Sequence, residues 1–253
     1  MKYTLDTIPV LDSYRAGCEC PLCRLRVSCE DQYVDSMLGA AYMEPDCRVK
    51  TNETGFCTRH FELMYDRRNR LGLALMTHTH MQEVISSLEG ILADCGEQKR
   101  GPLSSLRGGK ADSGGAPQKI RARIGGCVIC EQVDGALQRY AYTIAQLYFT
   151  NAEFKAMFDQ SKGFCLPHLA LVMEMADGTL SGAQAAEFKK ALAALELQNL
   201  RRIEGEIEWF TLKFDYRNTD KPWGNSRDAV ERAINKLMGA CVGEDAQMPA
   251  HND

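Results

Sequence analysis

The stretches Gly55-Phe56-Cys57-Thr58-Arg59-His60 and Gly163-Phe164-Cys165-Leu166-Pro167-His168 repeat each other and decide how the rest of the chain is interpreted. Each follows a Cys-x-x-Cys pair, formed by Cys20 and Cys23 in the first case and by Cys127 and Cys130 in the second. The offset between matched residues is 107 for the cysteine pairs and 108 for the later motif. The chain therefore contains an internal duplication of one cysteine-rich unit.

Both motifs have the spacing of metal ligands. A Cys-x-x-Cys turn brings two thiolates within reach of one ion, and a Cys-x-x-His at the start of a helix places two more ligands on one face. We predict one Cys/Cys/Cys/His site in each copy. Three thiolates and one imidazole favour Zn²⁺, although similar ligands also hold iron–sulfur clusters, which stay open as the alternative. The predicted ligands are Cys20, Cys23, Cys57 and His60 in the first copy, and Cys127, Cys130, Cys165 and His168 in the second.

Cys18 stands two residues before Cys20 and complicates the first copy. It is a competing ligand, a thiol that supports the ligands, or a spare residue, and the register of the second copy favours the spare. The remaining cysteines have no counterparts in the duplication, so we expect small core or surface residues. They are Cys29, Cys47, Cys95 and Cys241.

Most of the chain has helical periodicity. Apolar residues recur at steps of three and four in 131–149, in 82–93 and in a long stretch that begins at Ser181 and carries apolar residues as far as Phe214. We predict a mainly α fold, a helical bundle built from two pseudo-repeats. The expected organisation is a first repeat at 1–98, a flexible Gly/Ser-rich linker at 99–118, a second repeat at 119–241 and a loose tail at 242–253.

Composition excludes several classes of protein. With 45% hydrophobic and 25% charged residues, the 253-residue chain has enough apolar side chains for a core. A net charge of −4 argues against general nucleic-acid binding. No window is apolar enough for a membrane span, and the first residues do not resemble a secretory signal. Together with eleven cysteines, these features lead us to expect a cytoplasmic, metal-binding protein, monomeric because the duplication already supplies internal symmetry.

The segment from Trp209 to Gly224 contains both tryptophans and has no counterpart in the first copy. Aromatic and arginine residues dominate binding interfaces, so one interpretation is a binding surface. The other is a helix end whose aromatic side chains close the core while its charges pair locally. The candidate binding residues are Trp209, Lys213, Asp215, Tyr216, Arg217 and Trp223.

No catalytic motif supports an enzyme, and a site filled by four protein ligands leaves no open position for catalysis at zinc. We expect a non-enzymatic binding or scaffold module that presents a surface to an unknown protein or small ligand. A redox or electron-transfer protein that uses the same ligands is the alternative. An enzyme with a pocket that uses Asp215, Arg217 or a tyrosine is a weaker third hypothesis.

The chain resembles a family of bacterial proteins of unknown function. The resemblance rests on Cys20-Pro21-Leu22-Cys23, on the two Gly-Phe-Cys-x-x-His motifs and on Lys213-Phe214-Asp215-Tyr216-Arg217-Asn218. The chain departs from the pattern at Val128, where the second Cys-x-x-Cys lacks the proline. The resemblance implies the ligand positions and no established activity.

Overall fold

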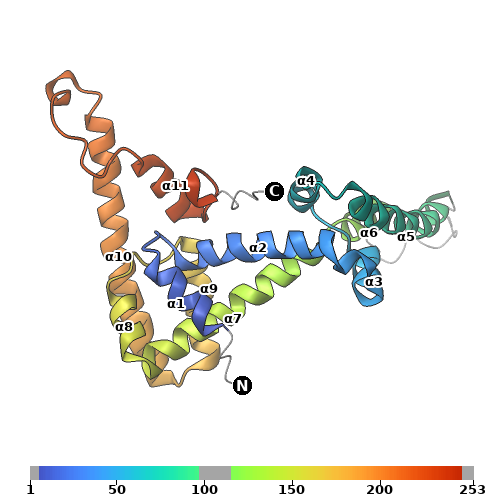
Figure 1. The fold of residues 1–253 in the computed structure, drawn as a ribbon, viewed down its shortest axis with the longest axis horizontal. Coiled ribbons are helices and arrows are strands. Elements are labelled where there is room, and N and C mark those ends of the chain that lie inside the picture. Colours follow the sequence, from blue (N-terminus) through green and yellow to red (C-terminus); the bar gives the residue numbers. More distant parts are fainter. Residues whose placement is uncertain (1–5, 97–114, 247–253) are drawn as a thin grey trace, which may run out of the picture. The chain divides into compact units, whose positions relative to one another are not determined.

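The computed structural model describes residues 6–96 and 115–246, and these residues are mostly helical and include no strand (Figure 1). The mainly α class is thus confirmed. The helices, in chain order, are α1 (Thr7–Arg15), α2 (Pro21–Gly39), η1 (Ala41–Met43), α3 (Pro45–Thr54), α4 (Thr58–Asp66), α5 (Arg70–Gly96), α6 (Ala116–Arg123), α7 (Val128–Thr150), α8 (Ala152–Asp159), α9 (Leu166–Thr179), α10 (Gly182–Leu212), η3 (Tyr216–Asn218), α11 (Ala229–Met238) and η4 (Glu244–Ala246).

The helices form two compact units, and their limits differ from those of the sequence repeats. Unit 1 consists of Met1–Asp31 and Val133–Asp253, and unit 2 consists of Gln32–Gln132. Each repeat contributes residues to both units. Helix α2 begins in unit 1 and ends in unit 2, and α7 does the reverse.

Unit 1 is organised around aromatic side chains. Tyr148 of α7 contacts the rings of Phe158 and Phe188 edge-on, with centroids 5.1 and 5.0 Å apart. Tyr14 of α1 contacts Phe154 of α8 in the same way at 4.9 Å. Helix α10 packs against α9 and α11, and α1 packs against α8 (Figure 1). The unit therefore has a densely packed core between helices that are distant in sequence.

Helix α10 begins as the sequence predicts. Ser181 forms a capping box with Gln184, which satisfies backbone groups at the helix start. Its buried stripe includes Phe188, Leu192 and Ile203, but the helix ends at Leu212. Phe214, expected on the same stripe, is 75% exposed. The predicted stripe is therefore wrong at this end, because the helical periodicity stops two residues earlier.

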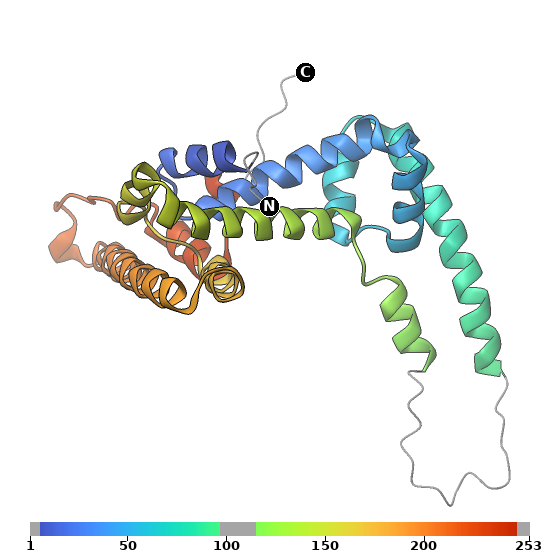
Figure 2. The same ribbon diagram turned by 90° about the horizontal axis from the view of Figure 1, so that it is seen from below.

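In unit 2, α5 packs against α3, α4 and α6 (Figure 2). Its first turns bury Leu73 and Met76, whereas Met81 and Ile85 are more than half exposed. The helix predicted over 82–93 is present as part of α5. From Thr77 to Ala93, however, none of its described side chains is buried, although Thr79 and His80 still form hydrogen bonds with α3.

The described residues correct two of the predicted segment boundaries, the end of the linker and the start of the tail. The expected linker at 99–118 lies largely outside the described residues, but Ala116 already begins α6. The expected tail is tied down at its start, because the side-chain oxygen of Asn235 accepts hydrogen bonds from the backbone N–H groups of Cys241 and Val242. The side-chain amide of Asn235 also donates to the carbonyl of Val242.

Candidate metal centres

All eight predicted ligands lie in the first turns of four helices. Cys57 and Cys165 are the N-cap residues of α4 and α9, and His60 and His168 follow three residues later. Cys20 and Cys127 immediately precede α2 and α7, and Cys23 and Cys130 again follow three residues later. Residues at the N-cap and the third helical position lie on one face. Each motif thus offers two ligand atoms at a helix N-terminus, where the helix dipole stabilises thiolates.

The first group, centre 1, consists of Cys20, Cys23, Cys165 and His168. The Sγ atom of Cys165 lies 3.8 Å from that of Cys20 and 3.6 Å from that of Cys23. The Nδ1 atom of His168 lies 3.4 Å from both of those sulfurs and 3.2 Å from Cys165 Sγ. The four atoms therefore converge on one point, as ligands of a single ion do.

The second group, centre 2, consists of Cys57, His60, Cys127 and Cys130. The Sγ atoms of Cys57 and Cys130 lie 3.8 Å apart. The Nδ1 atom of His60 lies 3.2 Å from Cys57 Sγ and Cys127 Sγ and 3.4 Å from Cys130 Sγ. Centre 2 therefore repeats the geometry of centre 1 with the same residue types.

Each centre combines motifs from both repeats, which corrects the predicted pairing within a copy. The Cys-x-x-Cys pair of the first copy joins the Cys-x-x-His of the second, and the reverse holds at the other centre. At 1.5 Å per residue, α2 is about 28 Å long and α7 about 35 Å long. The helices that follow, α3 and α8, are much shorter than α2 and α7. They therefore cannot return the chain to the cysteine pair at the start of the long helix. The pair at the start of each long helix therefore meets a motif from the other copy.

A family model described as a family of unknown function, DUF6062, matches residues 1–244, which include both centres. The chain belongs to this family. No curated protein and no solved structure matches the chain. In this DUF6062 member, no helix among the described residues has the length and apolar character that crossing a membrane requires.

Hydrogen bonds and burial give the thiols within each centre different pKa values. Hydrogen bonds from the thiols of Cys20 and Cys23 lower the pKa of Cys165 to about 4, and the positive charge of Lys236 acts in the same direction. Burial raises the pKa of Cys20. In centre 2, burial raises the pKa of Cys127, but hydrogen bonds with His60 and with the backbone of Cys130 and Cys57 together outweigh it, so the pKa falls to about 6. In each centre, hydrogen bonds therefore favour the thiolate form of one cysteine, Cys165 in centre 1 and Cys127 in centre 2.

A glycine before each Cys-x-x-His permits a close approach of other groups. Gly55 and Gly163 both have φ of +75°. A Cβ at Gly55 would lie 2.5 Å from His80 Nε2, and one at Gly163 would overlap the carboxylate of Glu196. The following Phe56 and Phe164 are buried beside the ligands. Glycine is therefore required by both the backbone conformation and the available space.

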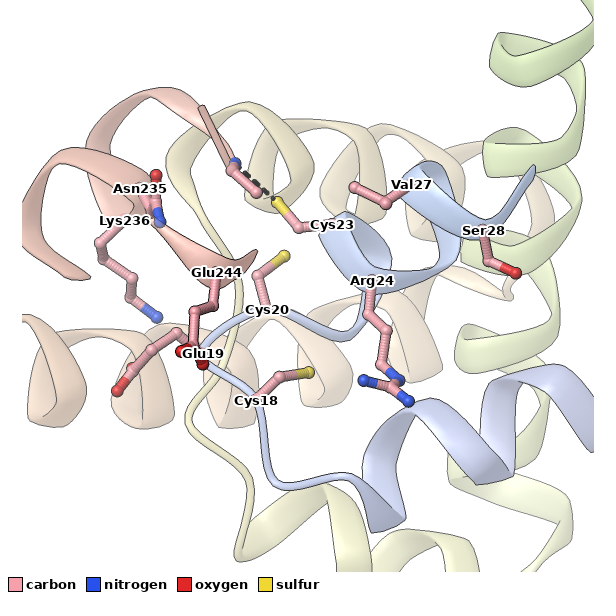
Figure 3. Close-up of a pocket in the computed structure, with 11 residues that line it drawn as sticks. Cys18, Glu19, Cys20, Cys23, Arg24, Val27, Ser28, Asn235, Lys236 and Glu244 are labelled. Carbon is pink, nitrogen blue, oxygen red and sulfur yellow. Dashed lines mark hydrogen bonds between the residues drawn. The ribbon is translucent and has the colours of Figure 1, made fainter. Parts of the chain in front are cut away.

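Centre 1 is supported by residues that the motif analysis missed. Lys236 of α11 pairs with Glu196 of α10 at 2.9 Å, and both side chains are almost fully buried. The other oxygen of Glu196 accepts the backbone N–H of Phe164 at 2.8 Å, directly before Cys165. The backbone N–H of Ala240 donates to Cys23 Sγ at 3.2 Å (Figure 3). The sequence did not reveal the roles of Glu196, Lys236 and Ala240, because each lies far from the cysteines along the chain.

A cavity of about 250 Å³ borders centre 1. Cys18, Cys20, Cys23 and Arg24 line it from the N-terminal side, and Lys236 lies across from them (Figure 3). Cys18 is not part of the ligand group, and its thiol donates to the carbonyl of Ser13 at 3.6 Å. The expectation that Cys18 is not a ligand agrees with this placement.

The other cysteines and histidines lie outside the two groups. The Cys29 thiol is buried against the hydroxyl of Tyr140, and Cys47 Sγ contacts Met37 Sδ. Cys241 is exposed. His80 Nδ1 lies 2.8 Å from the carbonyl of Asn52, and no candidate group includes His78. The side chain of Cys95 and all of His251 lie outside the described residues.

The candidate binding residues in the last turn of α10 and just after it form a local network. Lys213 is buried, and its ammonium donates to the carbonyls of Asn218, Thr219 and Lys221 at 2.6 to 2.8 Å. The indole N–H of Trp209 donates to the carbonyl of Pro222. The six residues are thereby gathered in one segment at the end of α10. The network is completed by an ion pair between Asp215 and Arg217.

The same network leaves part of the segment open to solvent. Tyr216 is 85% exposed and Arg217 is also exposed. The pKa of Asp215 is lowered by its hydrogen bonds with Arg217. Lys213 therefore stabilises the fold of the segment, whereas Tyr216 and Arg217 are accessible to other molecules.

Proposed function

We propose that this chain is a helical binding module whose two centres each hold one zinc ion as a structural element. The observation that carries the proposal is the spacing of the ligand atoms. With zinc–sulfur bonds of about 2.3 Å and zinc–nitrogen bonds of about 2.0 Å, a tetrahedron has edges of about 3.8 Å between sulfurs and about 3.5 Å between sulfur and nitrogen. The sulfur–sulfur distances of 3.6 to 3.8 Å and the sulfur–nitrogen distances of 3.2 to 3.4 Å are close to these edges.

The donor set supports zinc over the other candidates. Thiolates and imidazole are soft and borderline ligands, which zinc accepts in closed tetrahedral sites. In a [4Fe–4S] cluster each cysteine binds a different iron, so the ligands have to spread around a much larger body than one ion. The ligand atoms of each group lie within 4.8 Å of one another, which favours a single ion.

A structural role follows from the chemistry of the ligands. Four protein ligands fill the coordination shell of zinc and leave no position for a substrate or water. Each centre ties two helix N-termini together, and an ion bound there adds its binding free energy to the stability of the fold. Thiols have to stay reduced to bind metal, which favours a reducing compartment such as the cytoplasm.

The segment 209–223 is the surface that we assign to partner binding. Phe214 and Tyr216 are 75% and 85% exposed at the end of α10. The buried Lys213 holds the backbone that presents them. Exposed aromatic side chains on a fixed backbone lose little entropy when a partner binds, which suits a protein or small ligand.

Elemental analysis and the visible spectrum of protein purified without oxygen test this proposal. We expect two zinc per chain and no colour, and a loss of helix signal in circular dichroism when a strong chelator is added. Iron with acid-labile sulfide would replace the proposal with a redox protein. Protein that keeps its full helix signal without any metal would remove the structural role.

For the binding surface, a paired substitution is informative. Phe214→Ala with Tyr216→Ala should leave zinc content and thermal stability unchanged and weaken capture of a partner. The matched control is Leu197→Ala on the exposed side of α10, which is 52% exposed and lies outside the segment. Equal capture by both variants would contradict the assignment.

A further inference from the structure

The two centres have the same ligands but unequal surroundings. All four ligands of centre 1 are buried, with Cys20 6%, Cys23 5%, Cys165 0% and His168 8% exposed. In centre 2, His60 and Cys127 are buried, whereas Cys57 and Cys130 are partly exposed. Cys57 and Cys130 are therefore more accessible to a chelator or an oxidant than the ligands of centre 1 are.

Centre 1 also receives support from a third chain segment. The turn after α11 covers its sulfurs, because Ala240 donates its N–H to Cys23 Sγ. Gly239 lies so close that a Cβ there would be 3.9 Å from Cys165 Sγ and 4.0 Å from Cys23 Sγ. The guanidinium of Arg26 holds this turn by donating to the carbonyl of Ala240 at 3.0 Å.

In centre 2, two supporting hydrogen bonds lie within the ligand-bearing segments themselves. Cys127 Sγ accepts the backbone N–H of Cys130, which belongs to the same turn. The backbone N–H of Val128 donates to the carbonyl of Gly55, and this bond joins the two ligand-bearing segments to each other. Partners around metal ligands change metal affinity by about 10- to 100-fold. The deeper burial of centre 1 and the turn after α11 that covers its sulfurs thus predict slower loss of its ion.

The cavity beside centre 1 does not make its ligands as accessible as those of centre 2. Cys20 and Cys23 are among its lining residues, but each exposes 6% or less of its surface. The other lining groups include both signs of charge, from Glu19 and Glu244 to Arg24 and Lys236. Cys57 and Cys130 are less deeply buried than these two cysteines.

We propose that centre 2 is an exchangeable, oxidant-sensitive zinc centre, and that centre 1 is the permanent one. This rests on the proposed zinc function. Cys57 Sγ and Cys130 Sγ lie 3.8 Å apart. Hydrogen peroxide accepts two electrons from this pair: the sulfur–sulfur bond forms, the O–O bond breaks, two protons are taken up and two waters leave. The loss of two thiolates releases Zn²⁺ from His60 and Cys127.

Two readouts on the full-length, zinc-loaded protein test the assignment. The first is the rate of zinc release to a coloured chelator, and the second is peptide mapping of alkylated and disulfide-linked cysteines at early times. We expect one zinc to leave about tenfold faster or more than the other. With stoichiometric peroxide, the first linked peptides should contain Cys57 and Cys130, while Cys20, Cys23 and Cys165 stay reduced.

Matched variants at the two centres identify which ion leaves. Cys57→Ser should remove the fast phase and leave one slowly released zinc, whereas Cys165→Ser should leave the fast phase in place. If either variant does not fold, the peptide map of the wild type decides by itself. Equal release rates, or earlier modification of centre 1, would overturn the assignment, while protein that binds no zinc would overturn the proposed function instead.

Discussion

Single residues around centre 1 explain why its backbone has the observed shape. Gly163 has a left-handed backbone, and the buried carboxylate of Glu196 occupies the space that a side chain would need. Glu196 in turn is held by Lys236 and by the backbone N–H of Phe164. This short chain of contacts joins α10 and α11 to the loop that carries Cys165. Both the glycine and the buried ion pair should therefore affect stability as well as metal binding.

Gly163→Ala should destabilise unit 1. The added methyl group meets the Glu196 carboxylate, and a non-glycine residue at φ of +75° is strained. We expect a loss of about 1–3 kcal/mol in the free energy of unfolding. Chemical denaturation followed by circular dichroism measures it.

Gly205→Ala is the matched control for that substitution. Gly205 lies inside α10, and no atom outside its own stretch of helix lies within 4 Å of the position its Cβ would take. Alanine there should stabilise the helix by about 0.5–1 kcal/mol. A destabilisation of the same size in both variants would show that the contact with Glu196 is unimportant.

Lys236→Met should be more harmful than removal of the whole ion pair. The substitution leaves the carboxylate of Glu196 buried without its cation, which costs about 3–5 kcal/mol. The double variant Lys236→Met with Glu196→Gln removes both charges and should recover part of that loss. Thermal and chemical denaturation of the three proteins gives the comparison, and a double variant less stable than Lys236→Met would contradict the argument.

At the scale of elements, helix N-termini are the main structural device of this protein. The starts of α2, α4, α7 and α9 each carry two ligands, at the N-cap and three residues later. A bound zinc with three thiolates has a net charge of −1, and two helix dipoles with their positive ends at each centre offset it. Proline at the first turn, as at Pro21 and Pro167, is compatible with this position because the N–H there has no partner within the helix.

At the end of α10, the buried side chain of Lys213 acts as a clamp, because its hydrogen bonds hold the backbone that follows the helix. Lys213→Met removes a buried ammonium that donates to three carbonyls. We expect the segment 209–223 to open, with a loss of about 1.5–3 kcal/mol. Both tryptophans lie in this segment, so a red shift and increased quenching of tryptophan fluorescence report the change.

Lys221→Met provides the control for the clamp. Its ammonium contacts the side chain of Asn218 at an exposed site. The stability of this variant should stay close to wild type. Its fluorescence should change only through the loss of the cation that lies 5.8 Å from the centroid of the Trp209 ring, without the red shift and increased quenching expected of an opened segment. Zinc content should be unchanged in both lysine variants, because neither residue contacts a ligand of either centre.

At the scale of the whole molecule, each compact unit contains one complete set of ligands. Centre 1 lies within unit 1 and centre 2 within unit 2. A lost ion should therefore loosen the unit that holds it first. We expect His168→Ala to raise hydrogen exchange mainly in residues 6–31 and 133–246, and His60→Ala to raise it mainly in 32–96 and 115–132. Uniform loss of protection in both variants would show that the units do not respond separately.

The sequence by itself determined the parts of this protein that depend on neighbours along the chain. The periodicity predicts the long helices, Ser181 predicts the start of α10, and the repeated motifs predict all eight residues of the two groups. These features are local, because a cap, a turn and an i to i+3 ligand pair are formed within a few residues. The helix end at Leu212 is the main exception, since apolar residues continue beyond it.

Only the tertiary structure decided which motifs meet. Every Cys-x-x-Cys is chemically suited to either Cys-x-x-His, so spacing could not exclude the pairing between copies. The outcome depends on the lengths of α2 and α7, which carry the chain away from its own first pair. The roles of Glu196, Lys236 and Ala240 could not be predicted from the sequence either, because they arise from contacts between helices. The ligand types are thus encoded locally, while their partners and their unequal burial are products of packing.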